Sequence, residues 1–351
     1  MTYQLDELMQ ACVDRGASDL HLTDGRPPVL RIHGRLVDME GDVLEESVLR
    51  DMVGELAGEK ARAEMADVGG SDFGLAFKGG SRFRVSVFRS KGGYRAVLRL
   101  IPSEMLSFDE IGVPEAARTL CRRPQGLFLV TGPTGSGKTT TLASMIHWIN
   151  TNMDRHIVTI EDPIEYEHSN IKSIITQREI GRDVAGFGEA MRRVLRQDPE
   201  VILLGEMRDL DTIAAAITAA ETGHLVFATL HTTGSARTVD RIIDAFPPDQ
   251  QDQIRVQLSV SLIAVLSQVL LPRADGPGRV AAFELMLRSS AIENLIRKNE
   301  TFKIPSVIQT SKAQGMVLMD DSLAALVDSG AVSVDVAREF ASDRAQFAGG
   351  T

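Results

Sequence analysis

The sequence has very few cysteines and lacks a secretory signal. Its 351 residues include only two cysteines, Cys12 and Cys121, far apart in the chain. This scarcity excludes a disulfide framework and the paired spacing of a zinc module, and it favours a reducing cytoplasm. The N-terminal residues do not combine a basic segment with an apolar one, so we expect no secretion signal. The expected location is therefore cytoplasmic.

Long hydrophobic runs are also missing. The longest nearly apolar stretch, residues 258–271, contains three serines and a glutamine. It is shorter than the roughly 20 residues that a membrane-spanning helix needs. We predict a buried core helix there. Any role at a membrane is therefore expected to be peripheral and to depend on a partner, without direct insertion.

Basic residues are outnumbered. The sequence has 38 Lys and Arg against 48 Asp and Glu, a net charge of −10. This balance disfavours a uniformly basic groove for nucleic acid. Apolar residues make up 43% and charged residues 25%, which is typical of a globular protein with an ample core. The length suggests two domains.

One stretch carries a complete nucleotide-binding motif. Residues 132–139 match the pattern G-x-x-x-x-G-K-[ST], between a buried strand at 127–130 and an apolar helical face from 142 to 149. A chance glycine-rich turn would lack these flanks. In such a loop the backbone N–H groups cradle phosphates, the lysine reaches the β- and γ-phosphates and the threonine hydroxyl ligates Mg²⁺. The residues expected to bind ATP are Gly132, Pro133, Thr134, Gly135, Ser136, Gly137, Lys138, Thr139 (also the Mg²⁺ ligand) and Thr140.

The pattern of strands and helices divides the chain near residue 101. Residues 1–101 combine helical stripes with short alternating strands and predict a small α+β domain. Residues 102–114, with two prolines and a glycine, are the expected linker. From 115 to 351 strands alternate with helices, which predicts a parallel α/β core whose final part, from about 289, is helical.

An apolar strand at 201–204 runs into Gly205 and Glu206. This is the form of a Walker B element in which glycine replaces the usual aspartate. We expect Glu206 to orient or deprotonate the attacking water, rather than simply face solvent.

A second acidic segment, residues 161–165, follows the strand predicted at 156–161. Because α/β sheets bind ligands at the carboxyl ends of their strands, Glu161 and Glu165 are expected to position the nucleophile or to hold Mg²⁺ through water. A solvated acidic loop is the alternative interpretation.

Histidines and arginines supply further candidates. His224 and His231 bracket the strand predicted at 225–230, at a spacing that does not suit zinc. His231 would lie where a γ-phosphate can be sensed, although a structural hydrogen bond is the simpler interpretation for either histidine. Five arginines alternate along the N-terminal strands, either as a solvated face or, in a ring, as arginine fingers that reach a neighbour's phosphates. They are Arg82, Arg84, Arg89, Arg95 and Arg99.

With these residues in view, the sequence resembles the PilT-type ATPases of type IV pilus machinery, within the wider group of secretion ATPases. The likeness covers nearly the whole chain, and Gly205-Glu206, unusual among P-loop enzymes, is usual in this group. The matching segments are 18–22, 82–85, the P-loop, 161–165 (the Asp box), 205–209 (Walker B), 223–233 (the His box), 304–310 and 315–316.

The resemblance implies a homohexameric ring whose protomers have an N-terminal PAS-like domain and a RecA-like core. ATP hydrolysis would be coupled to rotation between the two. Glu206 would be the catalytic base, with Glu161, Glu165 and His231 around the nucleotide, and Arg84 and Arg99 would act in trans. The implied partner is the inner-membrane platform protein of the pilus, and the implied output is pilus retraction, seen as twitching motility.

Extension and secretion relatives usually carry a Cys-x-x-Cys zinc module and a longer N-terminal region. The two distant cysteines, and the absence of an expected extra domain, favour the retraction type instead. One departure concerns residues 291–298, where the family reads Ala-Ile-Arg-Asn-Leu-Ile-Arg-Glu. Here Glu293 and Lys298 reverse the charge. A PilU-like accessory retraction ATPase, the paralogue that is also a candidate partner, therefore stays open.

Two other classes of function share parts of this pattern. A RecA-like nucleic-acid translocase would need a basic channel, which the net charge disfavours, and we expect no nucleic-acid partner. A subunit that binds nucleotide only for assembly would not need the hydrolytic residues. The intact Lys138, Thr139 and Glu206 therefore argue for an enzyme, a Mg²⁺-dependent ATPase.

Overall fold

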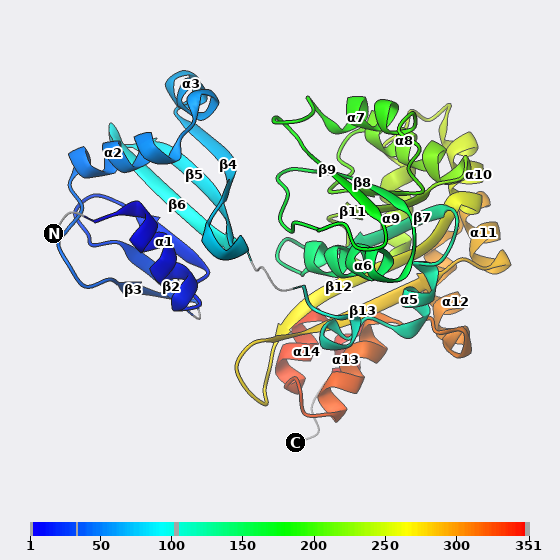
Figure 1. Ribbon diagram of the computed structural model, residues 1–351. Helices are drawn as coiled ribbons and strands as arrows, with labels where there is room; N and C mark the ends of the chain where they lie inside the picture. The colour runs from blue at the N-terminus through cyan, green and yellow to red at the C-terminus, as the bar shows by residue number, and fades with distance from the viewer. Residues whose placement is uncertain (1–2, 33, 102–104, 348–351) are drawn as a thin grey trace. The chain divides into compact units, whose positions relative to one another are not determined.

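The computed structural model describes residues 3–32, 34–101 and 105–347 (Figure 1). The chain forms two compact units. The first comprises Met1–Glu104 together with Pro163–Glu167, and the second comprises Met105–Asp162 and His168–Thr351.

The first unit is built on a six-stranded antiparallel sheet, in the order β3-β2-β1-β6-β5-β4. Side chains alternate across it, so that Phe83, Val85 and Val87 are buried with the helices while Arg84 is exposed. Figure 1 shows the helices of this unit along the sheet. The elements are α1 (Leu5–Asp14), β1 (Asp19–Leu22), β2 (Val29–Ile32), β3 (Arg35–Asp38), α2 (Glu46–Leu56), α3 (Glu59–Val68), β4 (Gly70–Ala76), η1 (Lys78–Gly80), β5 (Arg82–Ser90) and β6 (Gly93–Ile101).

Local sequence signals account for most of these elements. Two successive helices, α2 and α3, are separated at Gly58, which is the N-cap of α3. β2 pairs with β3 in an antiparallel hairpin, and His33 between them lies outside the described residues.

The second unit contains a seven-stranded sheet in the order β13-β12-β7-β11-β10-β8-β9. All neighbouring strands are parallel except β13, which runs antiparallel to β12 at one edge. Its strands are β7 (Gly126–Thr131), β8 (His156–Glu161), β9 (Ile174–Glu179), β10 (Val201–Leu204), β11 (Leu225–Leu230), β12 (Leu262–Pro272) and β13 (Arg279–Leu287).

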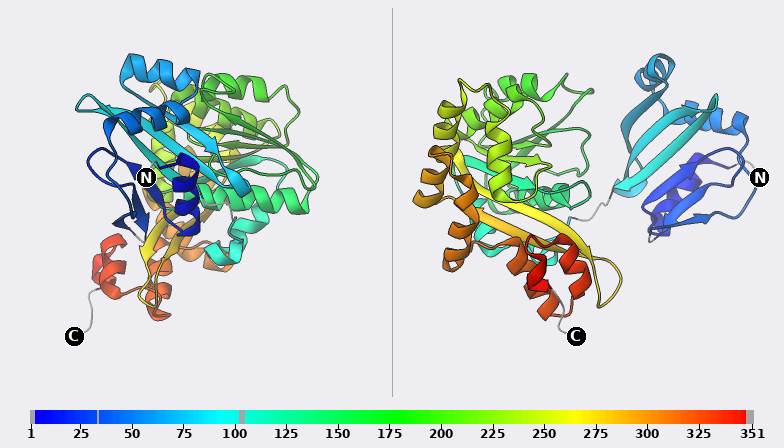
Figure 2. Two further views of the ribbon diagram at one scale, coloured as in Figure 1. Left: turned by 60° about the vertical axis from the view of Figure 1, so that its left-hand side comes forward. Right: turned by 180° about the vertical axis from the view of Figure 1, so that it is seen from behind.

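Helices cover both faces of this sheet, as Figures 1 and 2 show. On β7, Leu127 and Leu129 join the core under one group of helices, whereas Phe128 and Val130 join the core under the other. One face carries α7 (Phe187–Val194), α8 (Leu210–Glu221), α9 (Ser235–Ile243), α10 (Gln251–Ser261), α11 (Ser290–Arg297) and α12 (Ile304–Thr310). The other carries α4 (Phe108–Ile111), α5 (Glu115–Leu120) and α6 (Lys138–Asn152). This two-sided cover is the layered arrangement of a RecA-like P-loop core.

The core helix predicted at 258–271 is wrong. Only the first part of that stretch belongs to α10, and from Leu262 the chain is strand β12, paired with β7 and β13. A strand that is buried on both faces reads as a continuous apolar run, and periodicity cannot separate it from a buried helix.

The predicted linker, 102–114, is only partly visible, because 102–104 lie outside the described residues. Ser107 caps the short helix α4, and Phe108 and Ile111 are buried in the second unit. The predicted boundaries at 1–101, 102–114 and 115–351 stay a prediction.

Two C-terminal helices, α13 (Met319–Asp328) and α14 (Val334–Phe340), pack on the far ends of β12 and β13. Three 3-10 turns complete this region: η2 (Thr301–Lys303), η3 (Lys312–Gln314) and η4 (Arg344–Phe347). Every helix in the described part of the chain is too short or too polar to cross a lipid bilayer.

Candidate active site

The parallel strands of the second unit bring several predicted residues to one edge of the sheet. The P-loop follows β7, Glu161 ends β8, Glu206 lies just beyond β10, and His231 follows β11. Because these strands are neighbours and parallel, their carboxyl ends meet at the same edge. The order of the strands therefore brings these residues together, although they are far apart in the sequence.

The P-loop packs directly against β12. Gly132 has φ 142°, and a Cβ there would lie 2.1 Å from the backbone oxygen of Gln268. Gly137 has φ 87°, and a Cβ there would approach the amide nitrogen of Gln268 to 2.9 Å. On the same strand, the Gln268 amide oxygen accepts a hydrogen bond from Thr141 Oγ1 at 2.7 Å. Only glycine fits at both positions without displacing the loop.

Lys138 starts α6 and is buried. Its ammonium group donates hydrogen bonds to the carbonyl oxygens of Gly132, at 2.8 Å, and Pro133, at 3.0 Å. The loop therefore holds the positive charge in place by its own backbone. A phosphate anion offers such a cation a stronger acceptor than a neutral carbonyl does.

Two hydroxyl groups near the loop are buried without a hydrogen-bond partner among the described residues. They are Thr131 Oγ1, at the end of β7, and Ser136 Oγ, inside the loop. A buried hydroxyl without a partner is costly, so each marks a place where a ligand or water supplies the missing bond. This observation fits a phosphate-binding loop.

The oxygen donors at this edge also suit a hydrated Mg²⁺. Thr139 is half-buried at the second position of α6, and carboxylates end the neighbouring strands at Glu161 and Glu206. Mg²⁺ is usually held by one or two protein oxygens and keeps several waters. The residue types are therefore those that a magnesium–nucleotide complex requires.

Glu206 is held from two sides. Its Oε1 lies 3.1 Å from His231 Nε2 and its Oε2 lies 2.8 Å from Arg208 Nη2, and its side chain is 18% exposed. Partial burial alone would raise the pKa of Glu206, but hydrogen bonds and charges from Arg208 and His231 outweigh it and place the pKa below its ordinary value. Glu206 is therefore an oriented, ionised carboxylate at neutral pH.

Gly205 occupies the place where other P-loop enzymes carry an aspartate, and its surroundings leave little room. Its N–H donates to the backbone oxygen of Ile160, and a Cβ there would lie 3.4 Å from that oxygen and from Glu161 Cα. A longer side chain would press against the end of β8. The glycine keeps β8 and β10 close together where both deliver a carboxylate.

Glu161 is buried at the end of β8. It accepts hydrogen bonds from Thr159 Oγ1, at 2.6 Å, and from Gln177 Nε2, at 3.1 Å. Gln177 also accepts a hydrogen bond from the His168 backbone N–H. The edge strand β9, which sequence analysis missed, therefore helps to fix the Glu161 side chain.

Glu165, Arg84 and Arg99 belong to the first unit. Arg84 and Arg99 are exposed and lie directly opposite each other on β5 and β6. Arg99 donates to Asp19 Oδ1 at 2.8 Å, so this arginine already has an anionic partner. The roles of these three residues at a nucleotide stay predictions.

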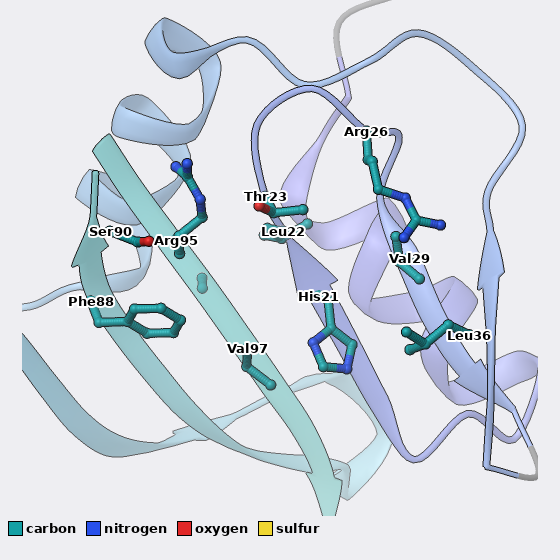
Figure 3. Close-up of a pocket in the computed structure, with 11 residues that line it drawn as sticks. His21, Leu22, Thr23, Arg26, Val29, Leu36, Phe88, Ser90, Arg95 and Val97 are labelled. Carbon is teal, nitrogen blue, oxygen red and sulfur yellow. The ribbon is translucent and has the colours of Figure 1, made fainter. Parts of the chain in front are cut away.

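The first unit also has a hollow of about 310 Å³, shown in Figure 3. His21, Val97, Leu36 and Phe88 line it together with two arginines at its rim. Arg26 pairs with Asp38, and Arg95 pairs with Asp24. Because these cations are already neutralised within the unit, the hollow does not resemble the phosphate-binding edge of the second unit.

Sequence analysis missed three residues that support the site: Ser267 and Gln268 on β12 and Glu284 on β13. Gln268 was noted only as a polar residue that interrupts an apolar run. Adjacent polar residues within such a run are the signal that a buried strand contacts something polar. A helical interpretation of 258–271 hid that signal.

The chain is similar in sequence to a family of known proteins. A family model described as "Type II/IV secretion system protein" matches residues 3–279. The chain belongs to this family. It is 45% identical over 335 residues to the type IV pilus retraction ATPase PilT of Pseudomonas aeruginosa, covering 95% of this chain and 97% of the relative. It is 37% identical over 332 residues to the type IV pilus ATPase PilU of the same organism, covering 95% and 87%.

Among solved structures, the crystal structure of the pilus retraction motor PilT with bound ADP matches with a TM-score of 0.92. The sequences are 42% identical, and the match covers 98% of each chain. This type II/IV secretion system protein is thus a PilT-type ATPase with an N-terminal PAS-like domain and a RecA-like core. The predicted family, fold class and ATPase activity are confirmed.

Proposed function

We propose that this protein is the ATP-hydrolysing motor that drives type IV pilus retraction, and hence twitching motility. It would work as a homohexamer at the cytoplasmic face of the inner membrane, under the pilus platform protein. The observation that carries the proposal is the contact of Glu206 with His231 beside an intact P-loop, in a chain that is 45% identical to PilT over nearly its full length.

In the proposed mechanism the P-loop binds the triphosphate first. Lys138 exchanges its two carbonyl acceptors for β- and γ-phosphate oxygens, and Ser136 Oγ gains a partner. Thr139 would ligate Mg²⁺, with Glu165 as a candidate second ligand through water. The metal would neutralise charge between the β- and γ-phosphates.

Glu206 would then align the attacking water. Its two oxygens already point in fixed directions, because one is held by His231 and the other by Arg208. The lowered pKa of Glu206 makes it a weak proton acceptor, so its main contribution is to orient the water rather than to remove its proton early. Loose phosphoryl-transfer transition states depend mostly on such positioning.

The remaining parts of the proposal concern the ring. Domains at 1–101 and 115–351, joined by a linker at 102–114, would move against each other as ATP is turned over. Arg84 and Arg99 would complete the neighbouring protomer's site and stabilise the charge that develops on the γ-phosphate. Glu161, Glu165 and His231 would surround the nucleotide. PilU, or a similar paralogue, is a candidate partner.

Arg84→Ala is expected to lower steady-state ATP turnover of the assembled ring by about a thousandfold or more, the lower end of the range for arginine fingers. ATP binding is expected to stay close to wild type, because the P-loop is untouched. Turnover measured by phosphate release, and binding measured with a fluorescent ATP analogue, test this directly. Arg50→Ala, which removes an exposed arginine from α2, is the matched control. Wild-type turnover in Arg84→Ala would refute the trans role.

The biological proposal is tested by deleting the gene in its host and complementing it with the wild type or with Lys138→Ala. Cells without a working copy are expected to be hyperpiliated and unable to twitch, and only the wild type is expected to restore movement. Bald cells would contradict retraction and indicate extension.

A PilU-like accessory role is the second candidate, because the chain is also 37% identical to PilU and carries Glu293 and Lys298 in the α11 segment. In the structure Glu293 pairs with Arg288 at 2.7 Å and with Arg297 at 3.7 Å. An accessory role predicts that twitching persists, weakened, after the deletion.

A further inference from the structure

The segment that carries His231 is fixed at its far end by two strands that the mechanism does not otherwise use. This segment, residues 231–234, will be called the His231 loop. It leaves β11, and its end forms the N-terminus of α9. Gly234 N–H donates to Ser267 Oγ on β12 at 2.9 Å. The next residue, Ser235, donates to Glu284 Oε1 on β13 through its N–H, at 2.7 Å, and its hydroxyl, at 2.8 Å.

Ser267 and Glu284 act as one support because they are directly opposite each other in the β12–β13 register. Two neighbouring side chains of the sheet thus hold the N–H group of Gly234, at the end of the loop, and that of Ser235, which follows it. The loop is also bonded to α9: Thr232 Oγ1 lies 2.8 Å from Thr238 Oγ1, and Thr238 Oγ1 donates to the Gly234 oxygen at 2.8 Å. The loop therefore has little freedom between its two anchors.

Glu284 is the strongest element of this support. It is half-buried, and its oxygen accepts two hydrogen bonds at the first turn of α9, where the helix dipole favours a negative charge. Gly234, with φ 83°, lets the chain turn beside that carboxylate, and a Cβ there would meet Glu284 Oε1 at 3.8 Å. Removing the carboxylate would free the start of α9 and, with it, the end of the His231 loop.

The same strand also reaches the phosphate side. Gln268, next to Ser267, accepts from Thr141 of α6 and packs against Gly132 of the P-loop. β12 therefore ties the His231 loop and the P-loop to adjacent residues of one strand. This strand therefore sets the distance between the P-loop and the His231 loop.

We propose that Glu284 is a positioning residue for ATP hydrolysis: it holds the His231 loop so that His231 keeps Glu206 in its working orientation. This rests on the proposed role of Glu206 and His231 in turnover. In this proposal Glu284 acts only through the loop and takes no part in the chemical step.

Glu284→Ala is expected to lower kcat about tenfold, because a small displacement of a positioned group is costly in rate. The affinity for an ATP analogue is expected to stay within about twofold, since both hydrogen bonds to Glu284 Oε1 come from Ser235 and not from the P-loop. Glu284→Gln keeps an oxygen that can accept the Ser235 hydrogen bonds, and it should retain most of the activity. All variants are measured as full-length assembled protein, with thermal unfolding recorded in parallel.

The matched control is Asp320→Ala. Asp320 is another half-buried carboxylate of the second unit, and it accepts hydrogen bonds from the N–H groups of Ser342 and Asp343, both at 2.8 Å. Its loss is expected to leave kcat unchanged. If Asp320→Ala lowers kcat as much as Glu284→Ala does, the loss of any carboxylate that accepts backbone hydrogen bonds has this effect. That result would overturn the proposal. Equal losses in Glu284→Gln and Glu284→Ala would do the same, because the loop's hydrogen bonds would then not be what matters.

A double-mutant cycle separates this inference from the function on which it rests. If Glu284 acts through His231, Glu284→Ala will have little further effect on kcat in a His231→Ala background. A further tenfold loss there would overturn the inference. If His231→Ala lowers kcat but Glu284→Ala does not, only the inference fails. If His231→Ala keeps wild-type kcat, the proposed role of His231 fails, and the inference fails with it.

Discussion

Lys138→Ala is expected to bind ATP at least about a hundredfold more weakly than the wild type, since charge-assisted bonds to phosphate are lost from a buried site. Turnover is expected to be undetectable, because the same ammonium group stabilises the charge of the transferring phosphoryl group. The structure supplies the physical reason. Lys138 is buried and held by Gly132 and Pro133, so its charge is preorganised at the place where the phosphates are expected.

Binding is measured by titration with a fluorescent ATP analogue and turnover by phosphate release. Lys172→Ala, which removes an exposed lysine from the same unit, is the matched control and should behave like the wild type. A Lys138→Ala protein that binds and hydrolyses ATP normally would show that the P-loop is not the working nucleotide site.

Glu206→Gln is expected to lower kcat by about a hundredfold or more, the loss that follows when a reacting group such as the attacking water is no longer held in place. ATP affinity is expected to change by less than about threefold, because the substitution keeps the shape of the side chain and leaves the P-loop intact. The amide has only one acceptor oxygen, whereas the carboxylate accepts from both His231 and Arg208. The bound water would lose its oriented, charged acceptor.

The pH dependence checks the same residue. Interactions with Arg208 and His231 outweigh partial burial and lower the pKa of Glu206, so the carboxylate is ionised at neutral pH and becomes protonated only below its ordinary range. Lowering the pH from about 8 to about 6 should therefore not titrate Glu206, whose unperturbed pKa is near 4.3.

The control for Glu206→Gln is Glu221→Gln, which changes an exposed carboxylate of the same unit. Normal turnover in Glu206→Gln would remove Glu206 from the catalytic role.

The parts of the site that lie within one stretch of sequence were predictable. The P-loop, Gly205-Glu206 and the acidic end of β8 carry their chemistry in consecutive residues, and the strands before them are short apolar runs. That these segments meet follows from the parallel order of β7, β11, β10 and β8, since parallel strands deliver their carboxyl ends to one edge. The contact of Glu206 with His231 is a consequence of β10 and β11 being neighbours.

Gln268 and Glu284 support the site but were not predictable, because their partners lie far away in the sequence. Gln268 meets Thr141 across 127 positions of sequence, and its strand is buried on both faces, so that it has the composition of a buried helix. Glu284 is a single acidic residue in an apolar strand, and nothing local indicates that Ser235 lies beside it. Such contacts are set by strand order and register, which a single sequence does not reveal.

The β12–β13 hairpin gives the protein a mechanical connection between its chemistry and its C-terminal helices. Side chains of β12 and β13 hold the His231 loop and the P-loop. On β13, the Phe283 N–H group donates to Ser322 of α13, and Leu285 pairs with Val317 through two backbone hydrogen bonds. Glu284 stands between these two anchors. A load on the C-terminal helices would therefore be transmitted to the residue that steadies His231, so pulling on them should slow the hydrolytic cycle before it loosens the grip on nucleotide.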